Sequence, residues 1–199
     1  MKQKIILITL LLISSIAVAQ NRFDATAWAG INMCQIDGDQ AGSYQHLGFH
    51  AAINTSFSLS RNIDSHWRML VELGYTQKGS TVTKNDMSIN LHYIEIPIMM
   101  TYNIKGFRVG AGIAPAILVN SKVTVAGGDD LPSANNYRRM DALPLMAEAS
   151  YSFNHIYILA RFQISMLSVS KSGGNAYRLF RSNNGQFSRL FSIGLGYKF

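Results

Sequence analysis

The chain has 199 residues, of which 15% are charged, and a formal net charge of +7. Soluble globular proteins carry about 25% charged residues, so this composition argues against an ordinary water-facing surface. Cys34 is the only cysteine, which excludes an intrachain disulfide. The length suits one domain, and no repeat of fixed period divides the chain.

The start of the chain has the features of a secretory signal peptide. Lys2 and Lys4 precede an apolar run over residues 5–18, and Ala17-Val18-Ala19 supplies a small-residue cleavage site. The run is too short to remain as a membrane anchor. We therefore expect residues 1–19 to be removed and residues 20–199 to form a single domain with 16 basic and 11 acidic residues.

Alternation of apolar and polar residues with a period of two recurs through the rest of the chain and predicts β-strands. A tilted strand needs about 9–11 residues to cross a bilayer, whereas strands of soluble proteins are usually shorter. Each predicted strand has at least ten residues, and no helical pattern of comparable length is present. The eight predicted strands are 23–34, 46–59, 65–78, 90–103, 107–120, 142–153, 155–168 and 188–199.

The links between these segments alternate between short and long. Short links rich in turn-forming residues join the second strand to the third, the fourth to the fifth and the sixth to the seventh. The other links are long, near 35–45, 79–89, 121–141 and 169–187. Outer-membrane barrels have this asymmetry, with short turns in the periplasm and long loops outside the cell. An even strand number then places both termini on the periplasmic side.

Each segment has one face of large apolar side chains and one face of small or polar side chains. In the last segment, Ile193, Leu195 and Tyr197 alternate with Ser192, Gly194 and Gly196. A soluble lipocalin-like barrel would turn its apolar face inward to hold a ligand, so alternation alone leaves both orientations open. The small residues favour the membrane barrel, because a narrow interior has room for little else.

The charges on the small and polar face are balanced, which also favours a lumen. Buried charges are tolerated when they are paired and hydrogen-bonded. We predict that four acidic and four basic residues form a structural polar network inside the barrel: Asp24, Glu72, Glu95 and Glu148 with Arg68, Arg108, Arg161 and Lys198.

These observations predict an all-β fold, an eight-stranded antiparallel up-and-down transmembrane β-barrel in the cell outer membrane. The last strand would pair with the first and leave no free edge. Tyr197 and Phe199 would then lie at the periplasmic interface, where aromatic girdles form. Pro97 and Pro115 cannot donate to a strand ladder, and we expect bulges at both positions.

Several stretches resemble the PorT-like outer-membrane β-barrel family of Bacteroidetes. They include ELGYTQKGS (72–80), LHYIEIPIMMTYNI (91–104), FRVGAGIAPAIL (107–118) and the terminal SIGLGYKF (192–199). Similar stretches at 28–39 and 47–53 extend the resemblance over nearly the whole mature chain. The resemblance implies a compact outer-membrane barrel. It also implies an accessory role in protein secretion, the process with which the founding member of the family is associated.

The sequence contains no pattern that predicts catalysis, a metal or a cofactor. His46 and His50 lie four residues apart, but on a strand this spacing separates them by roughly 13 Å, beyond the reach of one ion. Gly110-Ala111-Gly112 lacks the strand-to-helix unit of a dinucleotide site. No serine, histidine and acid arrangement indicates a catalytic triad. We expect neither an enzyme nor a bound cofactor.

Basic residues gather in or beside the last long link, which has no acid between positions 169 and 189. They form a possible anion-contact loop: Lys171, Arg178, Arg181 and Arg189. Clustered cations attract lipid phosphates or anionic polymers, but a solvated loop is the simpler explanation and the one we favour. Aromatic residues interleave with these cations as in nucleic-acid binders, but an exported barrel has little occasion to meet nucleic acid.

Three functions follow as alternatives. The first is a structural or interaction protein that presents its outer loops at the cell surface, as a monomer in contact with outer-membrane lipid, an anionic surface polymer or another envelope protein. The second is an accessory component of secretion or transport. The third is a lipocalin-like carrier. Because side chains nearly fill an eight-stranded barrel, we expect a plugged lumen rather than a channel.

Overall fold

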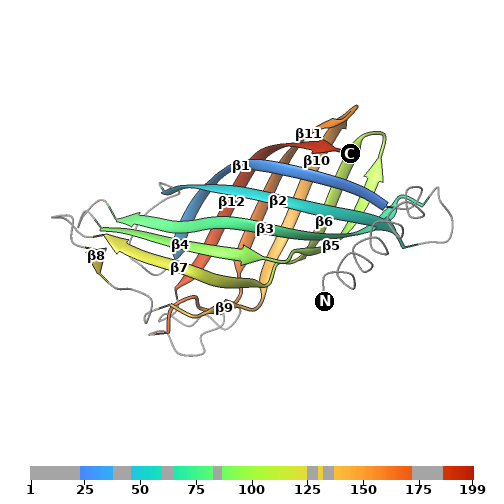
Figure 1. Cartoon of the computed structure of the whole chain (residues 1–199). Helices are drawn as coiled ribbons and strands as arrows, with labels where there is room; N and C mark the ends of the chain where they lie inside the picture. The colour runs from blue at the N-terminus through green and yellow to red at the C-terminus, as the bar shows by residue number, and fades with distance from the viewer. Residues whose placement is uncertain are drawn as a thin grey trace, which may run out of the picture.

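The computed structural model describes residues 23–37, 46–59, 65–82, 87–124, 130–131, 137–171 and 186–199. Figure 1 shows long tilted strands that wrap around a common axis. The predicted signal peptide lies outside the described residues. Within those residues, no helix has the length and apolar character needed to cross a membrane.

Twelve elements are distinguished because two of the eight strand paths around the barrel are interrupted, a third begins with a separate short element, and β8 pairs with β7 outside these paths. Their bounds are β1 Phe23–Asp37, β2 His46–Ser58, β3 Trp67–Val82, β4 Met87–Glu95, β5 Ile98–Ile104, β6 Phe107–Ile113, β7 Ala116–Thr124, β8 Asp130–Leu131, β9 Met140–Asp141, β10 Pro144–Phe153, β11 Ile156–Ser165 and β12 Phe187–Lys198. The paths β4–β5, β6–β7 and β9–β10 each act as one barrel strand.

All neighbouring strands are antiparallel, and the sheet closes on itself. β12 pairs with β1 from Thr26↔Lys198 to Asp37↔Phe187, while β1 pairs with β2 and β2 with β3. The remaining ladders continue through β4–β5, β6–β7 and β10 to β11 and back to β12. The prediction of a closed, eight-stranded antiparallel barrel is confirmed. The last strand pairs with the first along its whole length.

Prolines cause the interruptions between β4 and β5 and between β6 and β7. A proline cannot donate to the ladder, but its carbonyl still accepts. Pro97 accepts from the Glu72 amide at 2.9 Å, and Pro115 accepts from the Ile96 amide at 2.9 Å. The ladders resume in register beyond both prolines. The bulge of this region lies elsewhere, between His92 and Tyr93.

The outer ends of several strands extend further than the sequence predicted. β3 continues to Val82 and β4 begins at Met87, so most of the expected loop at 79–89 is strand. β7 likewise continues to Thr124, within the expected loop at 121–141. Gly79, Ser80 and Ser121 have the composition of a loop, yet their backbones pair with neighbouring strands. Composition was therefore a poor guide to where pairing stops.

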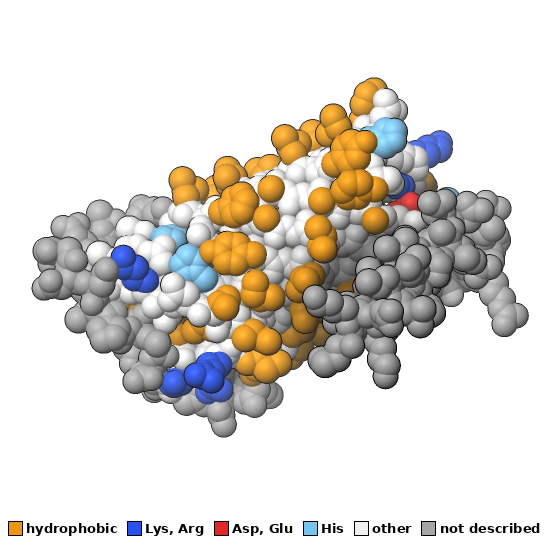
Figure 2. Space-filling model, viewed as in Figure 1, with side chains coloured by type: hydrophobic (Ala, Val, Ile, Leu, Met, Phe, Trp, Pro, Cys, Tyr) orange, Lys and Arg blue, Asp and Glu red, His pale blue; other side chains and the backbone are white. Residues whose placement is uncertain are grey.

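The apolar faces point outward and the small and polar faces point inward. Ile193 and Leu195 are 44% and 61% exposed, whereas Ser192 and Arg161 are 0% and 1% exposed. Figure 2 shows the outward apolar side chains over the middle of the barrel, with charged side chains towards its two ends. This orientation contradicts the lipocalin-like alternative, which requires the apolar faces to line the interior.

Aromatic side chains surround the end of the barrel that carries the short turns and the C-terminus. Neighbouring strands contribute three pairs of rings with centroids 4.6 to 5.7 Å apart: Phe23–Phe57, Trp67–Tyr102 and Phe107–Tyr151. Tyr197 on β12 and Phe199 directly after it form a fourth pair, with centroids 5.4 Å apart. Amphipathic rings of this kind form girdles at membrane interfaces. The arrangement identifies this end as one edge of the membrane belt, and Tyr197 and Phe199 lie in it as predicted.

Candidate functional site

The centre of the lumen holds a cluster of ion pairs around Arg161, which lies on β11. Its guanidinium donates to both carboxylate oxygens of Glu72, at 2.7 and 2.9 Å, across the barrel from β3. It also donates to Glu148 on the adjacent β10, at 2.6 and 3.1 Å. Planar guanidinium groups suit such two-carboxylate contacts. One cation therefore joins opposite walls of the barrel.

Arg108 balances the second carboxylate of this cluster. It lies on β6 and donates to Glu148 at 3.1 Å and to Ser150 at 3.1 Å. The four groups thus carry two positive and two negative charges. Because buried charges are tolerated only when they are paired, this balance explains how the narrow interior accommodates them.

Aromatic and polar side chains of β1 and β2 cover the cluster from one side. The Trp28 indole donates to Glu72 at 2.9 Å, and the Arg161 guanidinium lies 4.6 Å from the centre of the Trp28 ring. His50 stacks on Trp28, with the two ring centroids 4.2 Å apart. Asn54 donates to Glu72 at 3.3 Å. Glu72 is therefore surrounded by donors from several strands.

Glycines on β12 leave room for two aromatic rings inside the barrel, those of Trp28 and Tyr157. A Cβ atom at Gly194 would lie 2.6 Å from the Trp28 ring, and one at Gly196 would lie 2.2 Å from the Tyr157 ring. Real Cβ atoms do not approach other carbon atoms so closely. The small residues of the last strand are thus the complement of large inward side chains on β1 and β11.

A second group of charges lies further towards the outer end. Lys78 on β3 is 1% exposed, and its Nζ lies 2.7 Å from Glu95 and 3.7 Å from Asp141. Gln163 donates to Glu95 at 3.1 Å, and Ser165 donates to Asp141. Lys78 and Asp141 were absent from the predicted network. Lys78 shares a face with Glu72 and could have been found from alternation, whereas Asp141 precedes the predicted segment by one residue.

The third group of charges lies at the periplasmic mouth. Asp24 on β1 pairs with Arg68 and Lys198, each at 3.1 Å, and the side chains of Asp24 and Lys198 are 31% and 40% exposed. Asp24 and Lys198 line a cavity of about 370 Å³, together with Asn103, Arg108 and Tyr157. The eight residues predicted for the lumen thus lie in these three groups, each with at least one charged partner.

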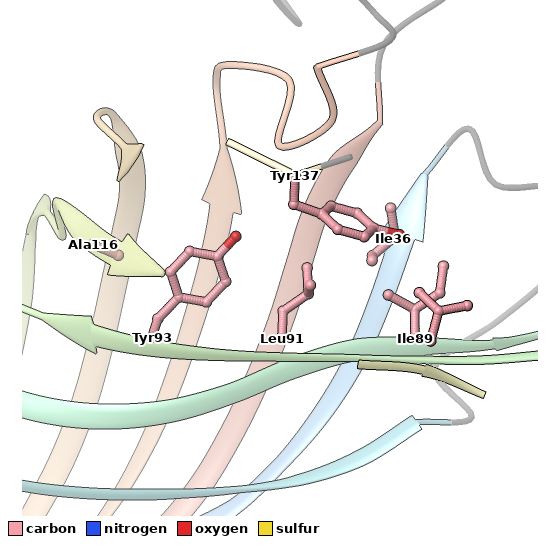
Figure 3. Close-up of a cluster of buried hydrophobic side chains, with 7 residues drawn as sticks. Ile36, Ile89, Leu91, Tyr93, Ala116 and Tyr137 are labelled. Carbon is pink, nitrogen blue, oxygen red and sulfur yellow. The ribbon is translucent and has the colours of Figure 1, made fainter. Parts of the chain in front are cut away.

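An apolar cluster fills the lumen at the outer end. Its members come from β1, β4, β7 and the segment before β9, and Figure 3 shows the Tyr137 ring directed towards Ile36. Ile36, Ile89, Leu91 and Tyr93 are each no more than 1% exposed. Leu70, Met99, Ala114 and Met146 form a smaller apolar cluster elsewhere in the barrel. Apolar packing therefore accompanies the ion pairs.

The residues of the predicted anion-contact loop do not lie together in the described part of the chain. Lys171 is exposed after β11, while Arg178 and Arg181 lie outside the described residues. Arg189 lies on β12 and pairs with Asp37 of β1 at 2.7 Å. An acid distant in sequence thus compensates Arg189, which inspection of the loop alone did not reveal.

The two histidines considered for a metal site occupy separate surroundings. His46 contacts Thr81 at 3.2 Å, whereas His50 stacks on Trp28 and lies 3.6 Å from Glu72. Across the described segments, no group of three or more histidine, cysteine or acidic side chains has a metal-binding arrangement.

The family of the chain follows from its match to a family model. The model described as the outer membrane protein beta-barrel domain matches residues 18–171. The chain belongs to this family. It is accordingly an outer-membrane protein, as the outward apolar belt and the aromatic girdle require. No curated protein matches the chain.

Solved structures similar to this outer-membrane barrel include three bacterial proteins. Neisserial surface protein A has 14% sequence identity and a TM-score of 0.49, with 89% of this chain and 97% of that chain covered. Ail of Yersinia pestis has 11% identity and a TM-score of 0.49, with 89% and 99% covered. OprG from Pseudomonas aeruginosa has 12% identity and a TM-score of 0.41, with 89% and 95% covered.

Proposed function

We propose that this protein is a monomeric, non-catalytic outer-membrane barrel with a plugged lumen, which serves as a structural or interaction protein at the cell surface. The single observation that carries the plug is the bridge from Glu72 through Arg161 to Glu148, which spans the lumen with buried ion pairs. Strand closure between β1 and β12 leaves no ladder edge for a second copy, which supports the monomer.

The plug has two parts that obstruct a solute in succession. From the periplasmic cavity, a solute would first meet the ion pairs of Arg161 and then the apolar cluster around Leu91 and Tyr93. Breaking the ion pairs would leave unpaired buried charges, and dispersing the apolar cluster would expose its side chains to water. Both barriers oppose spontaneous opening.

Conductance across planar lipid bilayers tests the plug. We expect the intact barrel to produce no stable openings, and a variant that combines Arg161→Ala with Leu91→Ala and Tyr93→Ala to produce small ones, because side chains of both parts of the plug are truncated. Arg189→Ala is the matched control, since Arg189 pairs with Asp37 and its side chain is 39% exposed. Stable openings of the intact, correctly folded barrel would contradict the proposal.

The surface role assigns contact with a partner to the outer links, 121–141 and 169–187. The partner would be an anionic surface polymer or another envelope protein, and the barrel would serve to hold the links in place. Replacing residues 125–136 and 172–185, within these links, by short glycine-serine turns tests this role and retains β7, β9 and the Tyr137 side chain. The barrel should still fold and show heat-modifiable gel mobility, while chemical crosslinks to envelope components in intact cells should disappear. Unchanged crosslinks would contradict it.

A role in protein secretion is the second candidate, and only the PorT-like sequence resemblance favours it. Deleting the gene and comparing the secreted proteins of mutant and parent strains separates the two functions. A passive surface barrel should leave secretion unchanged, whereas an accessory component of secretion should cause loss of specific proteins from the culture fluid. Complementation with the loop-replaced barrel would identify which part is required.

A further inference from the structure

We propose that Arg138, Arg139 and Lys171 form a binding site for the phosphate of a phosphorylated lipid headgroup in the outer leaflet. The site goes beyond the surface role proposed above, because it lies on the barrel wall and does not depend on a plugged lumen. It also differs from the predicted anion-contact loop, with which it shares only Lys171.

The three cations come from two parts of the chain, residues 138–139 and residue 171, which backbone pairing brings together. Tyr137 and Ser170 form an antiparallel bridge, and the Arg138 amide donates to the Val169 carbonyl at 2.9 Å. The Tyr137 side chain is 5% exposed and lies within the outer apolar cluster. This anchor fixes the backbone beside which Arg138, Arg139 and Lys171 lie.

The cations line an open hollow together with Met140. Met140 is 55% exposed and pairs in register with Ile117, which is also 55% exposed, so both face the acyl chains. Arg138 and Arg139 immediately precede Met140 at the outer end of β9. Figure 2 shows basic side chains at this end of the barrel, beyond the apolar belt. The hollow therefore lies at the height of lipid headgroups.

The charge and chemistry of this hollow suit a phosphate. Arginine presents several N–H donors in a planar fork that matches phosphate oxygens, and lysine adds a point charge. The nearest acid in sequence, Asp141, faces the lumen and lies 3.7 Å from Lys78. A phosphorylated lipid could place its acyl chains along Met140 and Ile117 while its phosphate contacts the cations.

Native mass spectrometry of the detergent-solubilised barrel provides the test, with phosphorylated lipid A and its dephosphorylated form as probes. We expect Arg139→Gln/Lys171→Gln to bind phosphorylated lipid A about tenfold more weakly than wild type. Lys105→Gln/Lys122→Gln removes the same charge elsewhere and should bind as wild type does. The dephosphorylated form should bind weakly to all three proteins, and heat-modifiable gel mobility should verify that each barrel is folded.

Four results would overturn the proposal. Equal binding by wild type and Arg139→Gln/Lys171→Gln would show that these cations do not bind the lipid. Equal binding of the two lipid A forms would show that the phosphate is not recognised. Retention of a soluble sulfated oligosaccharide, without retention of phosphorylated lipid A, would assign the cations to surface polysaccharide instead. Failure of millimolar inorganic phosphate to displace the lipid would support a membrane-anchored ligand over a free ion, whereas displacement would contradict it.

Discussion

The centre and the outer end of the lumen are both filled by side chains, but the side chains differ in kind. At the centre, Arg161 joins Glu72 and Glu148, whereas at the outer end Leu91, Ile89 and Tyr93 belong to an apolar cluster. The centre depends on charge balance, so the loss of one partner leaves another charge unpaired. The outer end depends on volume, so the loss of one side chain leaves a cavity. Mutations in the two regions should therefore differ in magnitude and in how they can be rescued.

The largest effect is expected at the centre. Arg161→Leu should lower the free energy of unfolding by about 3–5 kcal/mol, because Glu72 and Glu148 lose a buried cation. Equilibrium unfolding in urea, monitored by gel mobility of the barrel in lipid vesicles, measures the change. Arg189→Leu is the matched control and should cost less than about 1 kcal/mol, since its pair with Asp37 is partly exposed. Similar losses of unfolding free energy for Arg161→Leu and Arg189→Leu would mean that burial of the central ion pairs does not affect their contribution to stability.

The second charged group should show the rescue expected of charge balance. Lys78→Met should be destabilising by about 3 kcal/mol, since Glu95 and Asp141 lose their buried cation. Adding Glu95→Gln and Asp141→Asn should restore much of this loss, because neutral amides need no counter-charge. The same unfolding assay compares the single and triple variants. A triple variant less stable than Lys78→Met would indicate that charge balance is not the controlling factor.

At the outer end, the expected effect is that of a cavity. Leu91→Ala should cost about 2–3 kcal/mol, from lost burial and from the space left behind. Leu195→Ala removes the same atoms from a side chain that is 61% exposed on the outer wall, so no internal cavity forms. Its cost should be clearly smaller in the same assay. Equal costs would mean that the outer lumen is loosely packed.

Overfilling the centre should have a smaller effect than emptying it. Gly194→Ala would place a methyl group 2.6 Å from the Trp28 ring, and we expect a loss of about 1–2 kcal/mol as the ring shifts. Tryptophan fluorescence should report the movement of Trp28, against the unchanged background of Trp67. Ala147→Val adds volume on the outward face and should leave both stability and emission nearly unchanged. An unperturbed spectrum for Gly194→Ala would contradict the close packing.

The smallest effect is expected at the periplasmic mouth. Lys198→Gln breaks one contact to Asp24, but Arg68 remains paired with that acid and both ends of the lost contact are partly exposed. Exposed ion pairs contribute at most about 1 kcal/mol, and salt screens them. The unfolding free energy should therefore change little, and less still at high ionic strength. A loss of unfolding free energy as large as that of Arg161→Leu would mean that the ion pairs of the mouth stabilise the barrel as much as the buried ones do.

Period-two alternation was enough to predict the barrel and the direction of each face. A one-residue error would have reversed a whole strand, and apolar residues at alternate positions constrained each register against such errors. The charges at positions 72, 148 and 161 therefore lay on the correct face. Their three-dimensional pairing was inaccessible, because Glu72 and Arg161 are 89 residues apart and meet only across the closed lumen.

The outer ends of the strands were poorly predicted for a related reason. Beyond the membrane belt, outward side chains need not be apolar, so the alternation weakens while backbone pairing continues. Gly79 and Ser80 consequently had the composition of a loop, although both pair with β4. Asp141 was missed because the sixth predicted strand, 142–153, began one residue after it. The sequence therefore specified the lipid-facing belt better than the extension above it.

The single cysteine provides the most direct test of the filled lumen. Cys34 faces inward near the outer end, is 1% exposed, and donates to the Gln77 carbonyl at 3.4 Å. The folded wild-type barrel in lipid vesicles should not react with a small water-soluble maleimide until it is denatured, while Lys105→Cys in a Cys34→Ser background should react at once. Rapid modification of Cys34 in the folded barrel would mean that water and solutes enter the lumen, and would contradict the account.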